Sequence, residues 1–210
     1  MQQTRINQGL PYYMDFTRQF PTVKHLAKSP LNKVYLLWQG LGYYSRARNM
    51  HVTAKQVVTD FNGQFPDTAS KLRELKGIGP YTAAAIASIC FGEQIPAIDG
   101  NALRVISRLY DIDEPVNTKK GVKTIEALSL ELIKNCDAGS YNQAVMDFGA
   151  IICTPGQPNC HICPLSVNCL SFKQNTIAIR PVKTGKTLLT VMMPCWPFIC
   201  HFYIIHWANS

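Results

Sequence analysis

The stretch that decides the fold is LKGIGPYTAAAIASI, residues Leu75–Ile89. Gly77 and Gly79 lie on either side of one isoleucine, in a short turn between two helical patterns, and glycine permits positive φ and close backbone approach. Pro80 follows at a first helical position, where its fixed φ suits the helix. The amides of the turn and of the helix start would point outward together. This arrangement predicts a site for an anion such as a DNA phosphate.

A second motif, AIDGN at Ala97–Asn101, places Asp99 directly before a predicted helix. Together with Leu75–Ile89, it resembles the helix-hairpin-helix and the catalytic aspartate segment of the endonuclease III superfamily of DNA glycosylases. A plainer alternative stays open for each motif, because G-x-G also forms simple tight turns and an Asp before a helix is most often an N-cap. The resemblance implies an all-α fold of two helical lobes, with the hairpin at about residues 68–91. The hairpin residues implied to bind DNA are Lys76, Gly77 and Gly79.

A third motif, CTPGQPNCHICPLSVNC at residues 153–169, holds four cysteines in the order Cys-x6-Cys-x2-Cys-x5-Cys. Four thiolates on one short loop can hold a [4Fe–4S] cluster. Zinc also accepts four cysteines, although zinc motifs usually pair two Cys-x2-Cys units, and free thiols are the other alternative. The resemblance to the endonuclease III superfamily implies the cluster, in a positional role because glycosidic hydrolysis needs no redox step. The implied ligands are Cys153, Cys160, Cys163 and Cys169.

Three further segments distinguish members within this superfamily. Bifunctional members carry a lysine two residues after the second hairpin glycine and form a Schiff base with the sugar, whereas Tyr81 stands there and a phenol makes no imine. QQT at residues 2–4, GLGYYSRARN at residues 40–49 and YNQAVMDFGA at residues 141–150 resemble adenine DNA glycosylases that act on adenine opposite 8-oxoguanine or guanine. The likeness runs from residue 2 to about residue 182.

The resemblance implies monofunctional hydrolysis of an N-glycosidic bond in double-stranded DNA, with the target adenosine flipped out into a pocket between the lobes. Asp99 would stabilise the oxocarbenium ion of the sugar or attack it covalently, and its place at a helix N-terminus favours the ionised form. Asn101 and Tyr81 would orient Asp99, the sugar or water. Gln3 and Tyr44 would enter the vacated stack or contact the facing purine, with a buried core position as the alternative for Tyr44. The residues implied to contact DNA outside the hairpin are Gln2, Gln3, Thr4, Tyr44 and Arg46.

The composition agrees with a folded DNA-binding protein. The 210 residues are 47% apolar and carry a net charge of +8, which suits a polyanionic partner. Eight cysteines with no apolar run at the start favour a cluster or metal over secreted disulfides. The periodicity predicts helices throughout, in a hairpin lobe at residues 1–110, a cluster lobe at residues 111–175, and a linker and apolar tail at residues 176–210. We expect a monomer in a bacterial cytoplasm, associated with the nucleoid and without a membrane partner.

Two features depart from the family pattern. The general acid of the family is a Glu in the helix before Gln-Gln-Thr, and the matching position falls before Met1. We therefore expect a start that is truncated, and little or no activity from the polypeptide as given. Residues 187–210 carry no Asp, Glu, Lys or Arg and approach the length of a membrane span, about 20 residues. Because Pro194 and Pro197 interrupt this stretch, we expect a frameshifted or truncated end in place of the family's 8-oxoguanine-recognising domain, and a weaker preference for 8-oxoguanine.

Three other functions stay open from the sequence. The first is an endonuclease III-type glycosylase/lyase acting on pyrimidine lesions, and the second is a DNA-binding fragment without catalysis. The third is an iron–sulfur protein of electron transfer.

Overall fold

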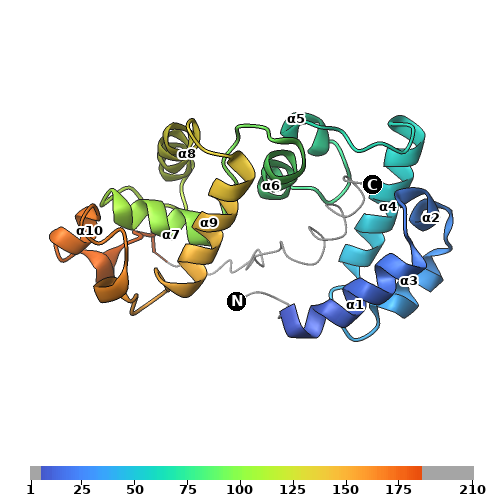
Figure 1. The fold of residues 1–210 in the computed structure, drawn as a ribbon, viewed down its shortest axis with the longest axis horizontal. Helices are drawn as coiled ribbons and strands as arrows, with labels where there is room; N and C mark the ends of the chain where they lie inside the picture. Colours follow the sequence, from blue (N-terminus) through green and yellow to red (C-terminus); the bar gives the residue numbers. More distant parts are fainter. Residues whose placement is uncertain (1–5, 186–210) are drawn as a thin grey trace. The chain divides into compact units, whose positions relative to one another are not determined.

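A computed structural model describes residues 6–185, and every regular element in this range is helical (Figure 1). The elements are α1 (Ile6–Gln19), α2 (Val23–Lys28), α3 (Leu31–Trp38), α4 (Ser45–Asp60), α5 (Ala69–Leu72), α6 (Pro80–Phe91), α7 (Gly100–Leu109), α8 (Lys119–Ile133), α9 (Ala138–Ile151) and α10 (Leu170–Lys173), with 3₁₀ turns at Cys160–Ile162 and Ile177–Ile179. The predicted all-α class is confirmed, since residues 6–185 contain no strand.

The helices form two compact units, which within the described residues are 6–93 (unit 1) and 94–185 (unit 2). The sequence placed the boundary after residue 110, whereas the observed division lies between Glu93 and Gln94. The reason is the packing of α7, which lies against α8, α9 and α10. The helix that follows Asp99 is therefore part of the unit that holds the cysteine loop.

Unit 1 is built around an aromatic core from α1 and α3. Phe16 and Trp38 are fully buried, with ring centroids 6.1 Å apart in an edge-on arrangement, and Phe20 packs edge-on against Phe16 at 4.9 Å. The Trp38 indole N–H donates to the carbonyl of Gly42 (3.0 Å), as a buried indole requires. This bond anchors the glycine-aromatic turn that precedes α4 to the core. In the same unit, α2 and α3 pack against α4.

The hairpin helices α5 and α6 pack on each other, and residues close by in the sequence fix where they begin and end. Gly79 is the N-cap residue of α6 and Pro80 its first residue, while Gly92 ends the helix with a φ of +70°, which glycine adopts readily. The side chain of Glu93 then reaches back, and its carboxylate accepts a bond from the Ala69 N–H at the start of α5 (2.6 Å). Glu93 thus caps the first hairpin helix and closes the hairpin on itself.

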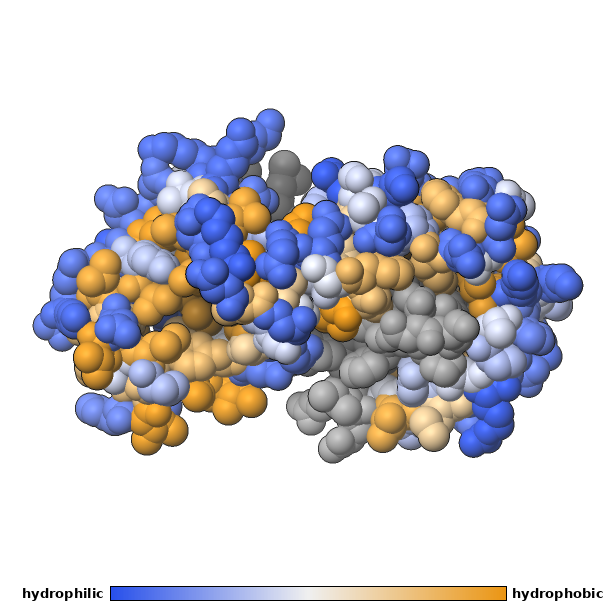
Figure 2. Space-filling model, turned by 45° about the horizontal axis from the view of Figure 1, so that its top comes forward, coloured by the Kyte–Doolittle hydropathy of each residue, from blue (hydrophilic) through white to orange (hydrophobic). Residues whose placement is uncertain are grey.

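Unit 2 has a core of Ile106, Ile112 and Ile125, contributed by α7, the segment after it and α8. Its surface carries many exposed apolar side chains around the cysteine loop, seen as orange areas on the left of Figure 2. They include Ile151, Ile162, Val167, Leu170, Phe172 and Ile179. In residues 6–185, no helix is both long enough and apolar enough to cross a membrane. The apolar tail at residues 187–210 lies outside the described residues.

Candidate functional site

The hairpin turn, residues 76–79, is exposed except for Ile78, which is buried. Gly77 has a φ of +82°, in the left-handed region that favours glycine. A Cβ at Gly77 would lie 2.8 Å from the side chain of Asn49, so this position also lacks space for any side chain. The turn leads directly into the positive end of α6, where Pro80 is the first residue. An exposed backbone turn at a helix N-terminus suits a phosphate group.

The three predicted catalytic residues divide between the units. Tyr81, the second residue of α6, is half-buried in unit 1, whereas Asp99 and Asn101 belong to unit 2. Asp99 is the N-cap residue of α7, and its Oδ1 accepts a bond from the Ala102 N–H (2.8 Å). Its Oδ2 accepts a bond from the side-chain amide of Asn101 (2.9 Å). The structure therefore places the side chains of Asp99 and Asn101 in direct contact.

The predicted preference of Asp99 for the ionised form is only partly supported. Burial raises the pKa of the Asp99 carboxyl above its ordinary value, because the carboxylate loses contact with water. The hydrogen bonds from Ala102 and Asn101 and the positive charge of Arg104 act in the opposite direction but do not outweigh the burial. Asp99 is thus a partly dehydrated carboxylate held by oriented donors.

Arg104, which was not singled out in the sequence, links Asn101 to the start of the cysteine loop. Its Nη2 donates to the side-chain oxygen of Asn101 (2.8 Å) and to the carbonyl of Gly149 (2.6 Å), and its Nε donates to the carbonyl of Cys153 (2.8 Å). With its oxygen held by Arg104, the Asn101 amide has its NH₂ directed to Asp99, which fixes the rotamer of both residues. The one signal in the sequence is the i, i+3 spacing of Asn101 and Arg104 on a predicted helix.

Two residues of α9 support the same site. Asn142, fully buried, accepts a bond from the Ala97 N–H (2.8 Å) and donates to the carbonyl of Ile95 (3.0 Å), so it holds the segment that leads into Asp99. Gly149 faces Asn101 so closely that a Cβ there would lie 2.6 Å from the Cβ of Asn101. Both belong to the YNQAVMDFGA segment, but the sequence alone assigned neither of them a role.

The glycine-aromatic turn before α4 differs in detail from the prediction. Tyr44 packs its ring edge-on against Tyr35 (5.7 Å between centroids) and is 44% exposed. Tyr43 is more exposed, at 56%, and adopts a φ of +47°, which is uncommon and strained for a tyrosine. Arg46 is buried, with its guanidinium 5.7 Å from the Trp38 ring and 5.3 Å from the Tyr43 ring. This interior position does not suit the direct DNA contact predicted for Arg46, since the aromatic rings cover the charge.

The predicted DNA contacts at residues 2–4 lie outside the described residues. For Gln2, Gln3 and Thr4, nothing in the structure adds to the prediction from the sequence.

The four cysteines Cys153, Cys160, Cys163 and Cys169 line one cavity, together with Arg108 and Phe148. Within residues 6–185, no three His, Cys, Asp or Glu side chains converge closely enough to hold a single metal ion. A [4Fe–4S] cluster takes four cysteine thiolates as its ligands, so four cysteines around one cavity fit it.

Arg108 supplies positive charge beside this cavity. The side chain is buried, its Nη1 donates to the carbonyl of Thr154 (2.8 Å) and lies 3.5 Å from the Sγ of Cys153, and its Nε donates to the carbonyl of Arg180 (3.1 Å). Burial and the neighbouring cysteines raise the pKa of Cys160. Ionising several of these thiols together is therefore unfavourable unless positive charge lies nearby. A cationic cluster core and Arg108 would both supply such charge.

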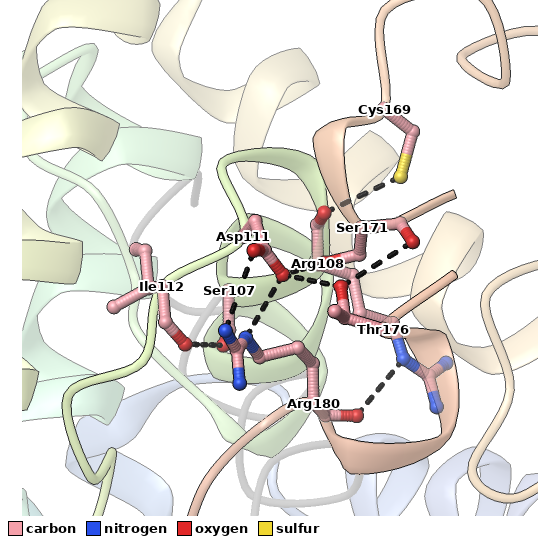
Figure 3. A network of polar contacts seen from close by, with 8 residues as sticks. All are labelled: Ser107, Arg108, Asp111, Ile112, Cys169, Ser171, Thr176 and Arg180. Carbon is pink, nitrogen blue, oxygen red and sulfur yellow. Dashed lines mark hydrogen bonds and ion pairs between the residues drawn. The ribbon is translucent and has the colours of Figure 1, made fainter. Parts of the chain in front are cut away.

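A second polar network fastens the segment after the cysteines to the end of α7 (Figure 3). Asp111 accepts bonds from the hydroxyls of Thr176 (2.5 Å) and Ser171 (3.0 Å), and it pairs with both the Nε (2.9 Å) and the Nη2 (3.3 Å) of Arg180. The Cys169 thiol donates to the carbonyl of Arg108 (3.3 Å) in the same group. The cysteine loop is thus fixed to α7 at both of its ends, by Arg104 and Arg108 at its start and by this network after Cys169.

The sequence is similar to proteins named adenine DNA glycosylase. One, from Buchnera aphidicola subsp. Schizaphis graminum, is 38% identical over 190 residues, which is 90% of this chain and 54% of the relative. Another, from Homo sapiens, is 39% identical over 170 residues, which is 80% of this chain and 31% of the relative. The chain spans about half the length of the Buchnera relatives, between 54% and 58%.

The fold is similar to solved structures of a thymine-DNA glycosylase and of endonuclease III. A thermostable thymine-DNA glycosylase superimposes with a TM-score of 0.74 at 26% identity, covering 82% of this chain and 79% of that one. Endonuclease III in a non-covalent complex with DNA superimposes with a TM-score of 0.66 at 23% identity, covering 79% and 76%, and supports the fold alone. Residues 1–134 match the family described as "HhH-GPD superfamily base excision DNA repair protein". This chain therefore belongs to the HhH-GPD superfamily of base excision DNA repair proteins.

Proposed function

We propose that this chain is a monofunctional DNA glycosylase that hydrolyses the N-glycosidic bond of adenine mispaired with 8-oxoguanine or guanine. The observation that carries the proposal is the carboxylate of Asp99, fixed by Asn101 and the α7 amide and partly withdrawn from water. Relatives named adenine DNA glycosylase at 38–39% identity support adenine as the base. The half-buried phenol of Tyr81, at the position of the lyase lysine, supports hydrolysis over lyase chemistry.

In this proposal, Asp99 acts on the positive charge that develops on the sugar as the bond to adenine breaks. A carboxylate that is partly dehydrated attracts such a charge more strongly than a fully solvated one, and its fixed orientation avoids reorganisation during the reaction. Asn101 and Arg104 act through Asp99 and are positioning residues. The same carboxylate also suits covalent attack on the sugar, as in retaining glycosidases.

DNA is held by unit 1 in this proposal. The hairpin turn grips a phosphate, which fixes the register of the enzyme on the duplex without selecting a sequence. We assign the aromatic wedge to Tyr43 rather than Tyr44, because Tyr43 is the more exposed of the two and is held in a strained conformation by the adjacent turn. Flipping the adenosine costs a few kcal/mol of unstacking, which an inserted ring offsets in part.

We propose a [4Fe–4S] cluster as the resident cofactor of the cysteine loop, held by Cys153, Cys160, Cys163 and Cys169. The bound cluster supplies a covalent cross-link of the loop, and no redox step is required for hydrolysis. The loop itself presents neutral and apolar side chains, among them the exposed Ile162 and Val167. Any DNA contact by these two side chains is therefore neutral.

The decisive experiment is single-turnover release of adenine from a duplex with A opposite 8-oxoguanine, beside A:G and T:G duplexes and the Asp99→Asn variant. The proposal expects slow adenine release, in which water or another group supplies the proton to the leaving base, and it expects this release to be lost in the variant. It also expects no thymine release and no covalent adduct with borohydride. A borohydride adduct would replace the proposal with the lyase alternative. Duplex binding without release by wild-type protein would replace it with a DNA-binding role.

A further inference from the structure

The backbone of Lys76, at the start of the hairpin turn, is held on both sides by one helix of the same unit. The Thr53 hydroxyl of α4 donates to the Lys76 carbonyl (2.6 Å). The Gln56 side chain of α4 accepts a bond from the Lys76 N–H (2.8 Å). The turn therefore depends on α4 as well as on its own flanking helices.

A third α4 residue lies against the turn. Asn49 fills the space beside Gly77, where its Cβ and Nδ2 are each 2.8 Å from the place a Gly77 Cβ would occupy. Asn49, Thr53 and Gln56 are spaced i, i+4, i+7, so they lie on one face of α4. We call these three residues the α4 polar stripe.

We propose that the α4 polar stripe consists of positioning residues that hold the hairpin turn in its phosphate-binding shape. This inference rests on the proposed DNA-binding function of that turn. A turn with two glycines has unusual conformational freedom, and ordering it at the moment of binding would weaken affinity. With both polar groups of the Lys76 backbone bonded and Gly77 confined by Asn49, much of that ordering is completed before DNA arrives.

The stripe also explains why the polar side chain of Thr53 is buried in α4, at 3% exposure. If Thr53 had a purely structural role, its bond to Lys76 would only stabilise the fold. Removing the hydroxyl would then lower the stability of the protein without changing how DNA is bound. The positioning role predicts a specific change in binding. When the turn loses its shape, the charge of Lys76 no longer neutralises a phosphate, so the salt dependence of affinity falls by about 0.9 in log–log slope.

The test compares Thr53→Val with wild type on a short undamaged duplex, over a series of salt concentrations and with thermal unfolding alongside. We expect about tenfold weaker binding at low salt, equivalent to 1.4 kcal/mol, together with the smaller slope. Thr53→Ser keeps the hydroxyl and restores both. Thr59→Val is the matched control, because the Thr59 hydroxyl donates to the carbonyls of Lys55 and Gln56 and to the carboxylate of Asp60, all within α4.

Gln56→Met provides a second variant on a half-exposed residue, where the effect on folding is small. A wild-type slope in both Thr53→Val and Gln56→Met overturns the inference, whatever their stability. Because the duplex is undamaged, this result does not depend on glycosylase activity. Absence of salt-dependent duplex binding by the wild-type protein itself would instead overturn the proposed function of the turn.

Discussion

Replacing Gly149 by Ala tests whether the position of Asp99 controls the rate of adenine release, because the change should disturb that position while leaving the protein folded. The new Cβ on α9 would lie 2.6 Å from the Cβ and 3.2 Å from the Cα of Asn101. Because carbon atoms pack best at about 3.5–4.0 Å, Asn101 or α9 must move by about 1 Å. Asn101 is bonded to Asp99 at 2.9 Å, so the displacement reaches the carboxylate. A misplacement of about 1 Å at a reacting group costs roughly a hundredfold in rate.

The same change has a small net effect on folding. Overpacking costs about 1–3 kcal/mol, whereas replacing a helical glycine by alanine returns about 1 kcal/mol. A net loss of up to 2 kcal/mol lowers the melting temperature by about 8 °C at most in a protein of this size. Gly149→Ala should therefore be folded at 25 °C and release adenine about a hundredfold more slowly than wild type.

The assay is single-turnover adenine release, with the melting temperature measured on the same preparation. Gln143→Ala is the matched control on α9, since Gln143 is bonded at the surface to Asp147 and should release adenine at the wild-type rate. Duplex affinity should be unchanged in both variants, because the hairpin turn lies in unit 1. A Gly149→Ala variant with the wild-type release rate would refute the proposal that Asn101 positions Asp99.

Three further predictions follow from individual residues. Asp99→Asn should slow adenine release by more than about a hundredfold. Because burial raises the pKa of Asp99, the unfolding free energy of the wild type should fall relative to that of the variant as pH rises from about 4 to 7, as measured in denaturant titrations. Gly77→Ala should weaken duplex binding in a filter or anisotropy assay, since it combines a φ of +82° with a contact of 2.8 Å to Asn49. Asp111→Asn should lower the melting temperature at pH 7. Because the Thr176 hydroxyl, with Ser171 and Arg180, lowers the Asp111 pKa, the difference from wild type should vanish as pH falls through that lowered value.

The parts of the structure that carry local signals were predictable from the sequence. Gly79-Pro80 marks the start of α6 within the hairpin, and the spacing of the four cysteines groups them on one loop before any tertiary structure is known. Asp99 as an N-cap is also a local feature, since its oxygen bonds an amide only three residues away. In each case, the partners lie close together in the chain.

The remaining parts depend on partners that are distant in the chain. Arg104 bonds Gly149 and Cys153, which lie 45 and 49 residues away, and no local pattern indicates such contacts. Arg46 has the character of a surface charge in the sequence, but the rings of Trp38 and Tyr43 cover it in the fold. The predicted lobe boundary after residue 110 differs from the observed one, between Glu93 and Gln94, because the packing of α7 on α8 and α9 is a tertiary property that no local pattern indicates.

One face of α9 sets the position of Asp99 from two directions. Asn142 holds the backbone of Ile95 and Ala97 before the aspartate, and Gly149, two helical turns further on, receives Asn101 after it. A carboxylate whose burial raises its pKa would relax toward water if its backbone were free to move. Fixing the chain on both sides prevents that relaxation, so the partial dehydration becomes a property of the folded state. On this argument, the dehydration of Asp99 is maintained by packing against α9, and loosening either contact should return its pKa toward the ordinary value.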